Sequence, residues 1–149
     1  MTMRARRGAS VAALALAAMA LAGCEPNPRR EMPAVVGAAL TYVARSGPTC
    51  IERVIAPWTP SRSLRRHESD APPGFERLFR PGVFRGGGGI KTAPAGIRIA
   101  ARSECRPVRG PLILGDRAML RVSRDGGDRK LWLAKEEGHW QVVADTPAT

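Results

Sequence analysis

Apolar residues recur at helical spacing in one stretch of the first third of the chain. They stand three, four and seven positions apart, so an α-helix would carry them in a single stripe: Met32, Val35, Val36, Ala39, Leu40 and Val43. Pro33 suits the first turn of a helix, and Gly47 followed by Pro48 is a typical stop. We therefore predict a helix from Met32 to Arg45 whose apolar stripe faces the core.

The last third of the chain alternates between apolar and polar residues, which is the period of a β-strand. This alternation predicts strands over residues 97–99, 118–123, 130–135 and 139–143. The sequences typical of turns between them are Asp125-Gly126-Gly127-Asp128 and Glu136-Glu137-Gly138. Residues 51–56 form either a short strand or a helical turn. One helix followed by a β-meander predicts an α+β domain, with the helix packed on a curved antiparallel sheet.

The segment 57–95 shows neither the spacing of an α-helix nor the alternation of a β-strand. Its 39 residues contain six Pro, six Gly and six Arg, a composition that favours long loops. Phe75, Leu78 and Phe79 are spaced for one helical turn that would dock on the domain. We expect Gly86–Gly89 to be mobile, and a loop of this length to be either functional or partly disordered.

The first 24 residues have the order of parts of an export signal. A basic start at Arg4, Arg6 and Arg7 precedes the uncharged run Val11–Ala22. Twelve helical residues would span about 18 Å, less than the roughly 30 Å of a bilayer core. The run therefore suits a cleaved leader better than a permanent transmembrane helix.

This leader ends in Leu21-Ala22-Gly23-Cys24 and resembles the lipobox of bacterial lipoproteins. The resemblance implies that the Cys24 thiol receives a diacylglyceryl group, that cleavage occurs before Cys24, and that its new amino group is acylated with, for example, palmitate. Two or three acyl chains would anchor the protein stably in a membrane. The alternative is an ordinary secretory leader with an incidental cysteine.

The same resemblance divides the chain into a signal peptide (1–23), a lipidated tether (24–31) and one domain (32–149) with an irregular insert (57–95). Glu25 follows the cysteine in place of the Asp that retains many Gram-negative lipoproteins in the inner membrane. The family rule thus favours the outer membrane, facing the periplasm. Arg29 and Arg30 would lie close enough to the lipid to meet anionic head groups.

The C-terminal segment Gly138-His139-Trp140-Gln141-Val142-Val143, together with the early helix, resembles small exported domains of the cystatin-like and NTF2-like type. These domains combine an early helix with a curved antiparallel sheet whose last hairpin has a Gly turn before a Trp-bearing strand. The resemblance implies that fold, and in the NTF2-like case a ligand pocket between helix and sheet. It assigns no catalytic residue.

Length and composition narrow the class of protein. Without the 23-residue leader, the 149-residue chain is long enough for one modest core, which excludes a multidomain enzyme, a large cofactor-binding fold and a long repeat array. The hydrophobic content of 44% excludes a wholly disordered chain. The formal net charge is +11.

The chain has three cysteines, and lipidation of Cys24 would leave Cys50 and Cys105. In an exported domain these two are expected to form a structural disulfide, and a loop of 55 residues would make it worth about 4 kcal/mol in the chain-entropy model. A zinc site or a catalytic thiol is the alternative. The absence of a Cys-x-x-Cys motif and the presence of only two histidines argue against zinc.

Four local patterns invite a chemical interpretation, and none forms a convergent site in the sequence. Gly86–Thr92 (GGGGIKT) is similar to a phosphate loop, but Ile90 stands where that loop needs Gly. His67 lies in a charged run with Glu68, Ser69 and Asp70, which is typical of a solvated loop. Two further patterns lie near the last turn: the adjacent carboxylates Glu136 and Glu137, and His139, which should point away from the Trp140 side chain.

A basic cluster in the insert offers one candidate binding site for anions. Its centre is Arg62, Arg65 and Arg66, with Arg77, Arg80 and Arg85 further along. Guanidinium groups would suit phosphate on lipids, lipopolysaccharide or teichoic polymers, whereas nucleic acid is a poor target outside the cytoplasm. Alternatively, the arginines have no binding role and reflect the amino-acid composition that a GC-rich genome produces, since the chain contains 21 Arg and three Lys.

Taken together, the sequence favours a lipid-anchored, non-enzymatic envelope protein whose domain binds a partner or has a structural role. No motif indicates a metal or a cofactor. Two alternatives stay open: an enzyme or small-ligand carrier of NTF2-like type, and an electrostatic binder of anionic envelope polymers or lipids. A deep apolar pocket would favour the first alternative, and a packed helix–sheet interface would count against it.

Overall fold

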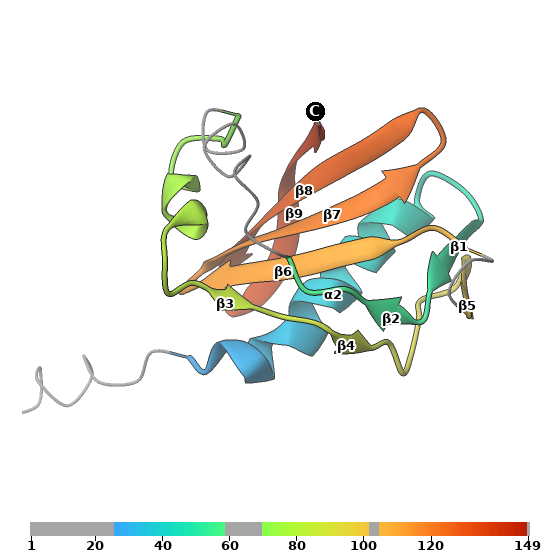
Figure 1. Cartoon of the computed structure of the whole chain (residues 1–149), viewed down its shortest axis with the longest axis horizontal. Coiled ribbons are helices and arrows are strands. Elements are labelled where there is room, and N and C mark those ends of the chain that lie inside the picture. The colour runs from blue at the N-terminus through green and yellow to red at the C-terminus, as the bar shows by residue number, and fades with distance from the viewer. Residues whose placement is uncertain (1–25, 59–69, 102–104, 149) are drawn as a thin grey trace, which may run out of the picture.

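A computed structural model describes residues 26–58, 70–101 and 105–148 of the protein. Its centre is an antiparallel five-stranded sheet with the strand order β3-β6-β7-β8-β9, on which the long helix α2 packs (Figure 1). These elements span α2 Pro28–Ala44, β3 Phe84–Arg85, β6 Val108–Leu114, β7 Arg117–Arg124, β8 Gly127–Glu136 and β9 His139–Pro147. The predicted α+β class, one helix on a C-terminal antiparallel sheet, is confirmed.

Helix α2 begins earlier than its apolar stripe indicated. Pro28 occupies its first turn, and the Asn27 side chain caps it by accepting a hydrogen bond of 3.0 Å from the Arg29 amide. Residues 28–31, which we had assigned to the tether, therefore form the first helical turn. The cap lies outside the apolar stripe, so hydrophobic spacing alone could not reveal it.

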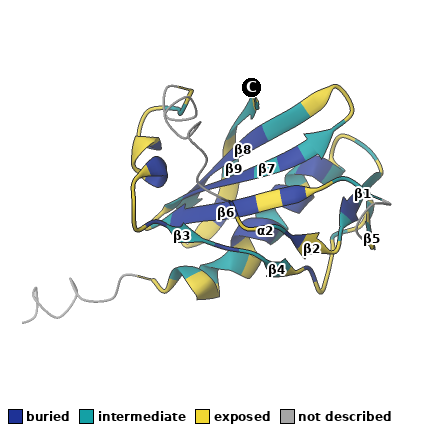
Figure 2. Ribbon diagram, viewed as in Figure 1, coloured by how far each residue is buried: buried dark blue, intermediate teal, exposed yellow. Residues whose placement is uncertain are grey.

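The predicted stripe is the face that α2 buries. Val35, Ala39, Leu40 and Val43 are fully buried, and Val36 is 6% exposed. They pack against alternate residues of the sheet, among them Ala118, Leu120, Val122, Leu131, Leu133 and Trp140. The dark blue buried segments of α2 and of the central strands lie against one another in Figure 2. Within the described residues, no helix is long and apolar enough to cross a bilayer.

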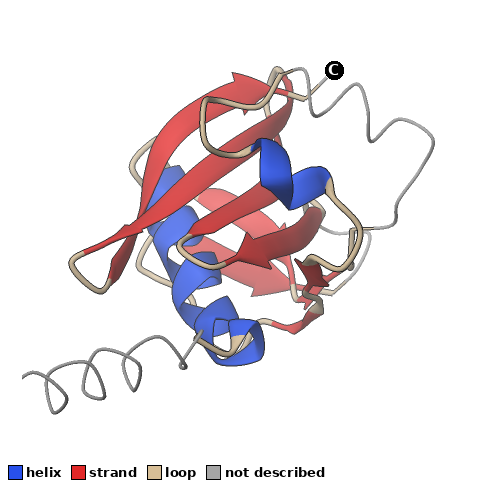
Figure 3. Ribbon diagram, turned by 90° about the vertical axis from the view of Figure 1, so that its left-hand side faces the viewer, coloured by secondary structure: helices blue, strands red, loops and turns tan. Residues whose placement is uncertain are grey.

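The opposite face of the sheet carries a second core. Its centre is Trp132, whose ring meets Phe75 and Phe79 edge-on at centroid distances of 5.5 and 5.9 Å. Phe75, Leu78 and Phe79 belong to the short 3₁₀ helix η1 (Glu76–Phe79) and the residue before it, as the sequence predicted. The two helices thus lie on opposite sides of the sheet (Figure 3).

Two small sheets lie beside the end of β6 and contain segments that we had expected to behave differently. Strand β1 (Thr49–Glu52) pairs in parallel with β5 (Ile97–Ala100), so β5 does not join the antiparallel meander. Strand β2 (Val54–Ile55) pairs with β4 (Gly88–Gly89), so these glycines are held in a ladder instead of forming the mobile loop we predicted.

The packing around the glycines explains that ladder. A Cβ on Gly86 would stand 2.8 Å from the Met32 sulfur and 2.9 Å from a ring carbon of Pro111, so only glycine lets the chain pass at this point. The amides of Gly86 and Ile90 donate to the carbonyl oxygens of Pro111 and Arg53, at 2.7 Å each. These amides are therefore committed to the fold and do not cradle a phosphate.

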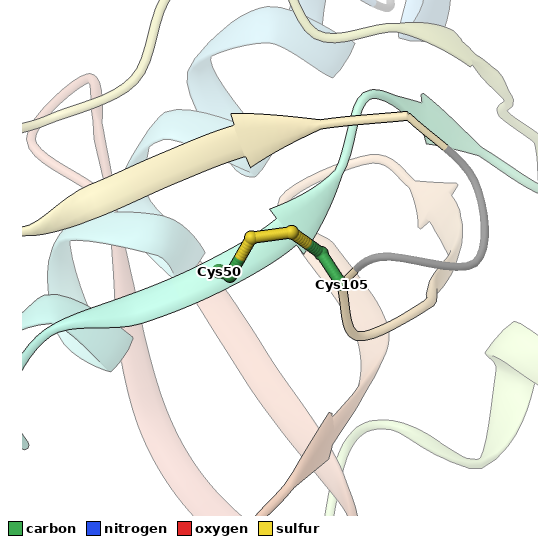
Figure 4. Close-up of a disulfide and its surroundings, with 2 residues drawn as sticks. All are labelled: Cys50 and Cys105. Atoms are coloured by element: carbon green, nitrogen blue, oxygen red, sulfur yellow. A yellow bond between two sulfur atoms is a disulfide. The ribbon is translucent and has the colours of Figure 1, made fainter.

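Cys50 in β1 and Cys105 just before β6 lie at disulfide distance, with their Cα atoms 5.0 Å apart (Figure 4). Their separation is 55 residues along the chain. The pair would therefore tie the segment that follows α2 to the start of the main sheet.

Strand β6 itself is absent from the sequence-based prediction. Gly110 and Pro111 interrupt its apolar run, and both residues are normally depleted in central strands. The register between β6 and β7 shifts at this point, between Arg109 and Leu112. The strand therefore keeps its place in the sheet by an irregularity that hydrophobic alternation does not indicate.

Candidate functional site

A groove of about 650 Å³ runs between helix α2 and strand β9. It lies beside the buried helix stripe and not beneath it, because that stripe is packed against the sheet. Its two walls, helix α2 and strand β9, come from segments that are far apart in the sequence. We take this groove as the candidate site.

The helix wall is lined by small side chains. Ala34, Ala38 and Thr41 follow one another at helical spacing on the flank of α2. The Thr41 hydroxyl donates to the Gly37 carbonyl oxygen at 2.8 Å, so it is engaged within the helix. Small residues here keep the space between α2 and β9 open.

The strand wall includes the backbone of β9 as well as its side chains. Residues 138–142 line the groove consecutively. Side chains of a strand alternate between its two faces, so consecutive lining means that the strand edge borders the groove. Trp140 and Val142 turn their side chains toward the helix side of the sheet, where Trp140 is buried. His139 is exposed, as the sequence predicted, and its Nδ1 lies 3.0 Å from the Glu137 carbonyl oxygen.

A carboxylate joins the two walls near the helix N-terminus. Glu31 accepts hydrogen bonds from Lys135 Nζ, 2.9 Å from each carboxylate oxygen, and from the Trp140 indole Nε1 at 2.6 Å. Its side chain is 16% exposed and that of Lys135 is 25% exposed. The hydrogen bond from Lys135, followed by that from Trp140, lowers the pKa of Glu31 and outweighs the opposing effect of burial. Glu31 is therefore a fixed anion whose acceptors are already in use.

The other end of the groove is built around Tyr42. Its hydroxyl donates to Asp145 Oδ2 at 3.2 Å. Asp145 also pairs with Arg129 Nε at 2.6 Å and with Arg124 Nη1 at 3.5 Å. Burial, and after it the nearby Asp145 charge, raises the pKa of Tyr42. The phenol is thus a neutral hydrogen-bond donor that fixes the helix C-terminal half to β9.

The groove carries positive charge at both ends. Arg30 and Arg45 line it and are exposed, and within the described part of the chain neither has an ion pair or side-chain hydrogen bond. Among the described residues that line the groove, Glu31 is the only carboxylate, and Lys135 neutralises it. The groove is therefore suited to an anionic occupant.

On the far face of the sheet, a buried lysine is paired with an exposed carboxylate. Lys130 is fully buried, and its Nζ lies 3.5 Å from Asp70 Oδ2. Burial lowers the pKa of Lys130, while the Asp70 charge opposes that shift. Asp70 belongs to the insert 57–95, so this pair fixes that part of the insert on the sheet.

The sequence candidates and the groove overlap little. Cys24, the anion-binding candidates Arg62, Arg65 and Arg66, and His67 lie outside the described residues. Glu136 and Glu137 are exposed beside the last turn, where Glu136 accepts from Gln141, and they do not face each other across a cleft. Of the residues singled out in the sequence, Arg30 and the region around Gly138, His139 and Trp140 belong to the groove.

Sequence reasoning missed the residues that build the site: Glu31, Tyr42, Lys135 and Asp145. The pair Glu31–Lys135 is separated by 104 positions, and Tyr42–Asp145 by 103. No local motif connects residues so far apart. The one available signal was Glu31, a single Glu in the first turn of a helix with an apolar stripe. Such a Glu is also common where it only stabilises the helix.

The described residues do not assemble a metal-binding set. Among residues 26–58, 70–101 and 105–148, no group of three or more His, Cys, Asp or Glu side chains is placed to hold a metal ion. Comparison of the chain with family models, with curated proteins and with solved structures finds no match. The interpretation of the groove thus depends on its own residues.

Proposed function

We propose that this protein is a lipid-anchored protein of the cell envelope whose domain binds a partner in the groove between α2 and β9. The proposal combines the lipobox at Leu21-Ala22-Gly23-Cys24 with the surface groove. Its domain is a binding module and not an enzyme. The outer membrane, with the domain facing the periplasm, is the proposed location because Glu25 follows the lipidated cysteine.

One observation favours a surface groove, and not a cavity between helix and sheet, as the binding site. The stripe residues Val35, Val36, Ala39, Leu40 and Val43 are each at least 94% buried, and Met32 is partly buried, so side chains fill the helix–sheet interface. An NTF2-like carrier or enzyme would need a ligand cavity at that interface. The groove between α2 and β9 lies instead at the flank of the helix, where a polymer chain or protein segment has access.

The anchor would also orient the groove. Helix α2 begins at Pro28, so the three residues between Cys24 and Pro28 span at most about 14 Å. The Arg30 end of the groove would then lie near the lipid head groups, and the Arg45 end would point away from them. A partner would be held close to the membrane surface.

Labelling with palmitate tests the anchor. Full-length wild type and Cys24→Ser are expressed in a Gram-negative host, and label and membrane fractionation are compared. The wild type is expected to carry label and to sediment with outer membranes, while Cys24→Ser loses both. The matched control is Cys50→Ser/Cys105→Ser, which removes two thiols, keeps Cys24 and should stay labelled. An unlabelled wild type, or labelled Cys24→Ser, would overturn the proposal.

A further inference from the structure

Strand β9 is an edge strand of the main sheet. It spans nine residues and pairs with β8 on one side, and no described strand pairs with it on the other. Edge strands in soluble proteins are commonly protected by Lys, by Pro or by a covering element. The groove-lining stretch 138–142 contains neither Lys nor Pro, and its open side is the groove. The backbone there is available for pairing.

The last hairpin determines which backbone groups face the groove. Its turn has two residues, Glu137 and Gly138, both with positive φ (50° and 81°), as in a type I′ turn. In such a hairpin the flanking residues Glu136 and His139 form the first hydrogen-bonded pair, and bonded pairs then alternate. Trp140 and Val142 therefore direct their N–H and C=O groups away from β8, into the groove.

We propose that β9 accepts an extended acidic peptide segment of an exported partner protein as a sixth strand of the sheet. Main-chain hydrogen bonds to Trp140 and Val142 would provide the pairing, and the small residues Ala34 and Ala38 would leave room for alternate side chains of the peptide. This inference depends on the proposed function, because it names the partner of the same groove.

The two arginines at the ends of the groove indicate the charge and the length of the peptide that would fit it. Arg30 in α2 and Arg45, the residue that caps its C-terminus, are 15 positions apart, which is about 22 Å along a helix. An extended strand covers that span with six or seven residues, at about 3.3 Å each. Acidic side chains near both ends of such a segment would meet the two arginines. A second copy of this chain fits less well, because it would bring like charges together from a protein of net charge +11.

The test measures binding of a labelled seven-residue probe, Asp-Val-Thr-Val-Thr-Val-Asp, to the full-length chain purified in detergent. One control probe has Lys in place of both Asp. A second has N-methyl groups on alternate amides, so it keeps its charge and loses strand pairing. The acidic probe is expected to bind about tenfold or more tightly than either control.

Three variants separate charge from pairing. Arg30→Glu/Arg45→Glu is expected to weaken binding at least about tenfold, and its matched control Arg53→Glu/Arg98→Glu, at exposed positions outside the groove, leaves binding unchanged. Val142→Pro removes an amide that faces the groove and is also expected to weaken binding about tenfold. Far-UV circular dichroism confirms that each variant is folded.

Each outcome decides the inference. Equal binding of the N-methylated probe, or of the Lys probe, would overturn it, as would unchanged binding by Arg30→Glu/Arg45→Glu. Light scattering that finds a wild-type dimer and a Val142→Pro monomer would assign the edge to a second copy and would also overturn it. Mass spectrometry of the same samples reports Cys24 lipidation, so a failure of the anchor is distinguished from a failure of peptide binding.

Discussion

The bonds of Glu31 provide the sharpest test of how the groove is held together. Glu31→Gln keeps the size of the side chain and one carbonyl acceptor for the Trp140 indole, but it removes the charge that faces Lys135. We expect the variant to unfold more easily than wild type, with a change confined to the α2–β9 contact. The variant therefore isolates the ionic part of the network.

The structure sets the magnitude. The lost interaction is a charged hydrogen bond of 2.9 Å whose partners are 16% and 25% exposed, between the surface and the buried limit. Charged hydrogen bonds contribute about 1.5–3 kcal/mol, and exposed ion pairs less than about 1 kcal/mol. Loss of an acidic group from the first helical turn adds about 0.3–1 kcal/mol. We expect Glu31→Gln to lower the free energy of unfolding by about 1–2 kcal/mol at pH 7.

The lowered pKa of Glu31 determines how the stability difference between wild type and Glu31→Gln changes with pH. The folded pKa of Glu31 lies below its ordinary value of 4.5, so the unfolded state binds the proton more readily. Its stabilising contribution is therefore complete above pH 4.5 and is lost as the pH falls through the folded pKa. The difference between wild type and Glu31→Gln should disappear over that acidic range.

Urea unfolding of the full-length chain, followed by tryptophan fluorescence at a series of pH values, measures this difference. Glu137→Gln is the matched control, because Glu137 lies in the exposed last turn. It should match wild type at every pH. If Glu31→Gln were as stable as wild type at pH 7, or if its deficit persisted below the folded pKa, the assignment of the network would be refuted.

Two further predictions concern the rest of the domain. Cys50→Ala/Cys105→Ala removes a bridge between residues 55 positions apart, so the variant should lose about 4 kcal/mol of unfolding free energy. Reduction of wild type should cause the same loss. Thiol titration reports whether the bond is present, and free Cys50 and Cys105 thiols in the untreated protein would contradict the prediction. Lys130→Met should be as stable as wild type or more stable at pH 7, because it replaces a buried charge with a shape-matched apolar chain. Burial lowers the pKa of Lys130 in the folded state below its ordinary value of 10.5, so the unfolding free energy of wild type should rise relative to that of the variant as the pH rises toward 10.5. Chemical unfolding at a series of pH values measures this difference, and a difference that stays constant with pH would refute the explanation.

Hydrophobic period and local turn chemistry determined much of the fold in advance. The stripe from Met32 to Val43 identified the helix and the face it buries, and the alternation around Trp132 and Trp140 identified the hairpins of the main sheet. These features depend on neighbours within a few positions, so the sequence displays them directly. The spacing of Phe75, Leu78 and Phe79 likewise predicted η1.

Other elements needed the whole chain in place. Strand β6 contains Gly110 and Pro111, which break the local pattern, yet pairing with β7 holds it in the sheet. The run Gly86–Gly89 has the composition of a loop, and β4 forms within it because Val54 and Ile55 provide a partner strand. Local propensity is weak compared with tertiary pairing in such segments.

The sequence by itself determined the α+β class and the cysteines available for pairing, and it predicts an export signal that ends at Cys24, because each depends on residue type and local order. Only the tertiary structure decided where the groove lies and which side chains line it. The groove joins the first helix to the last strand, and its fixed carboxylate, Glu31, meets Lys135 and Trp140 from more than 100 positions away. Contacts over such separations have no local period or motif, so they become visible only when the fold brings them together.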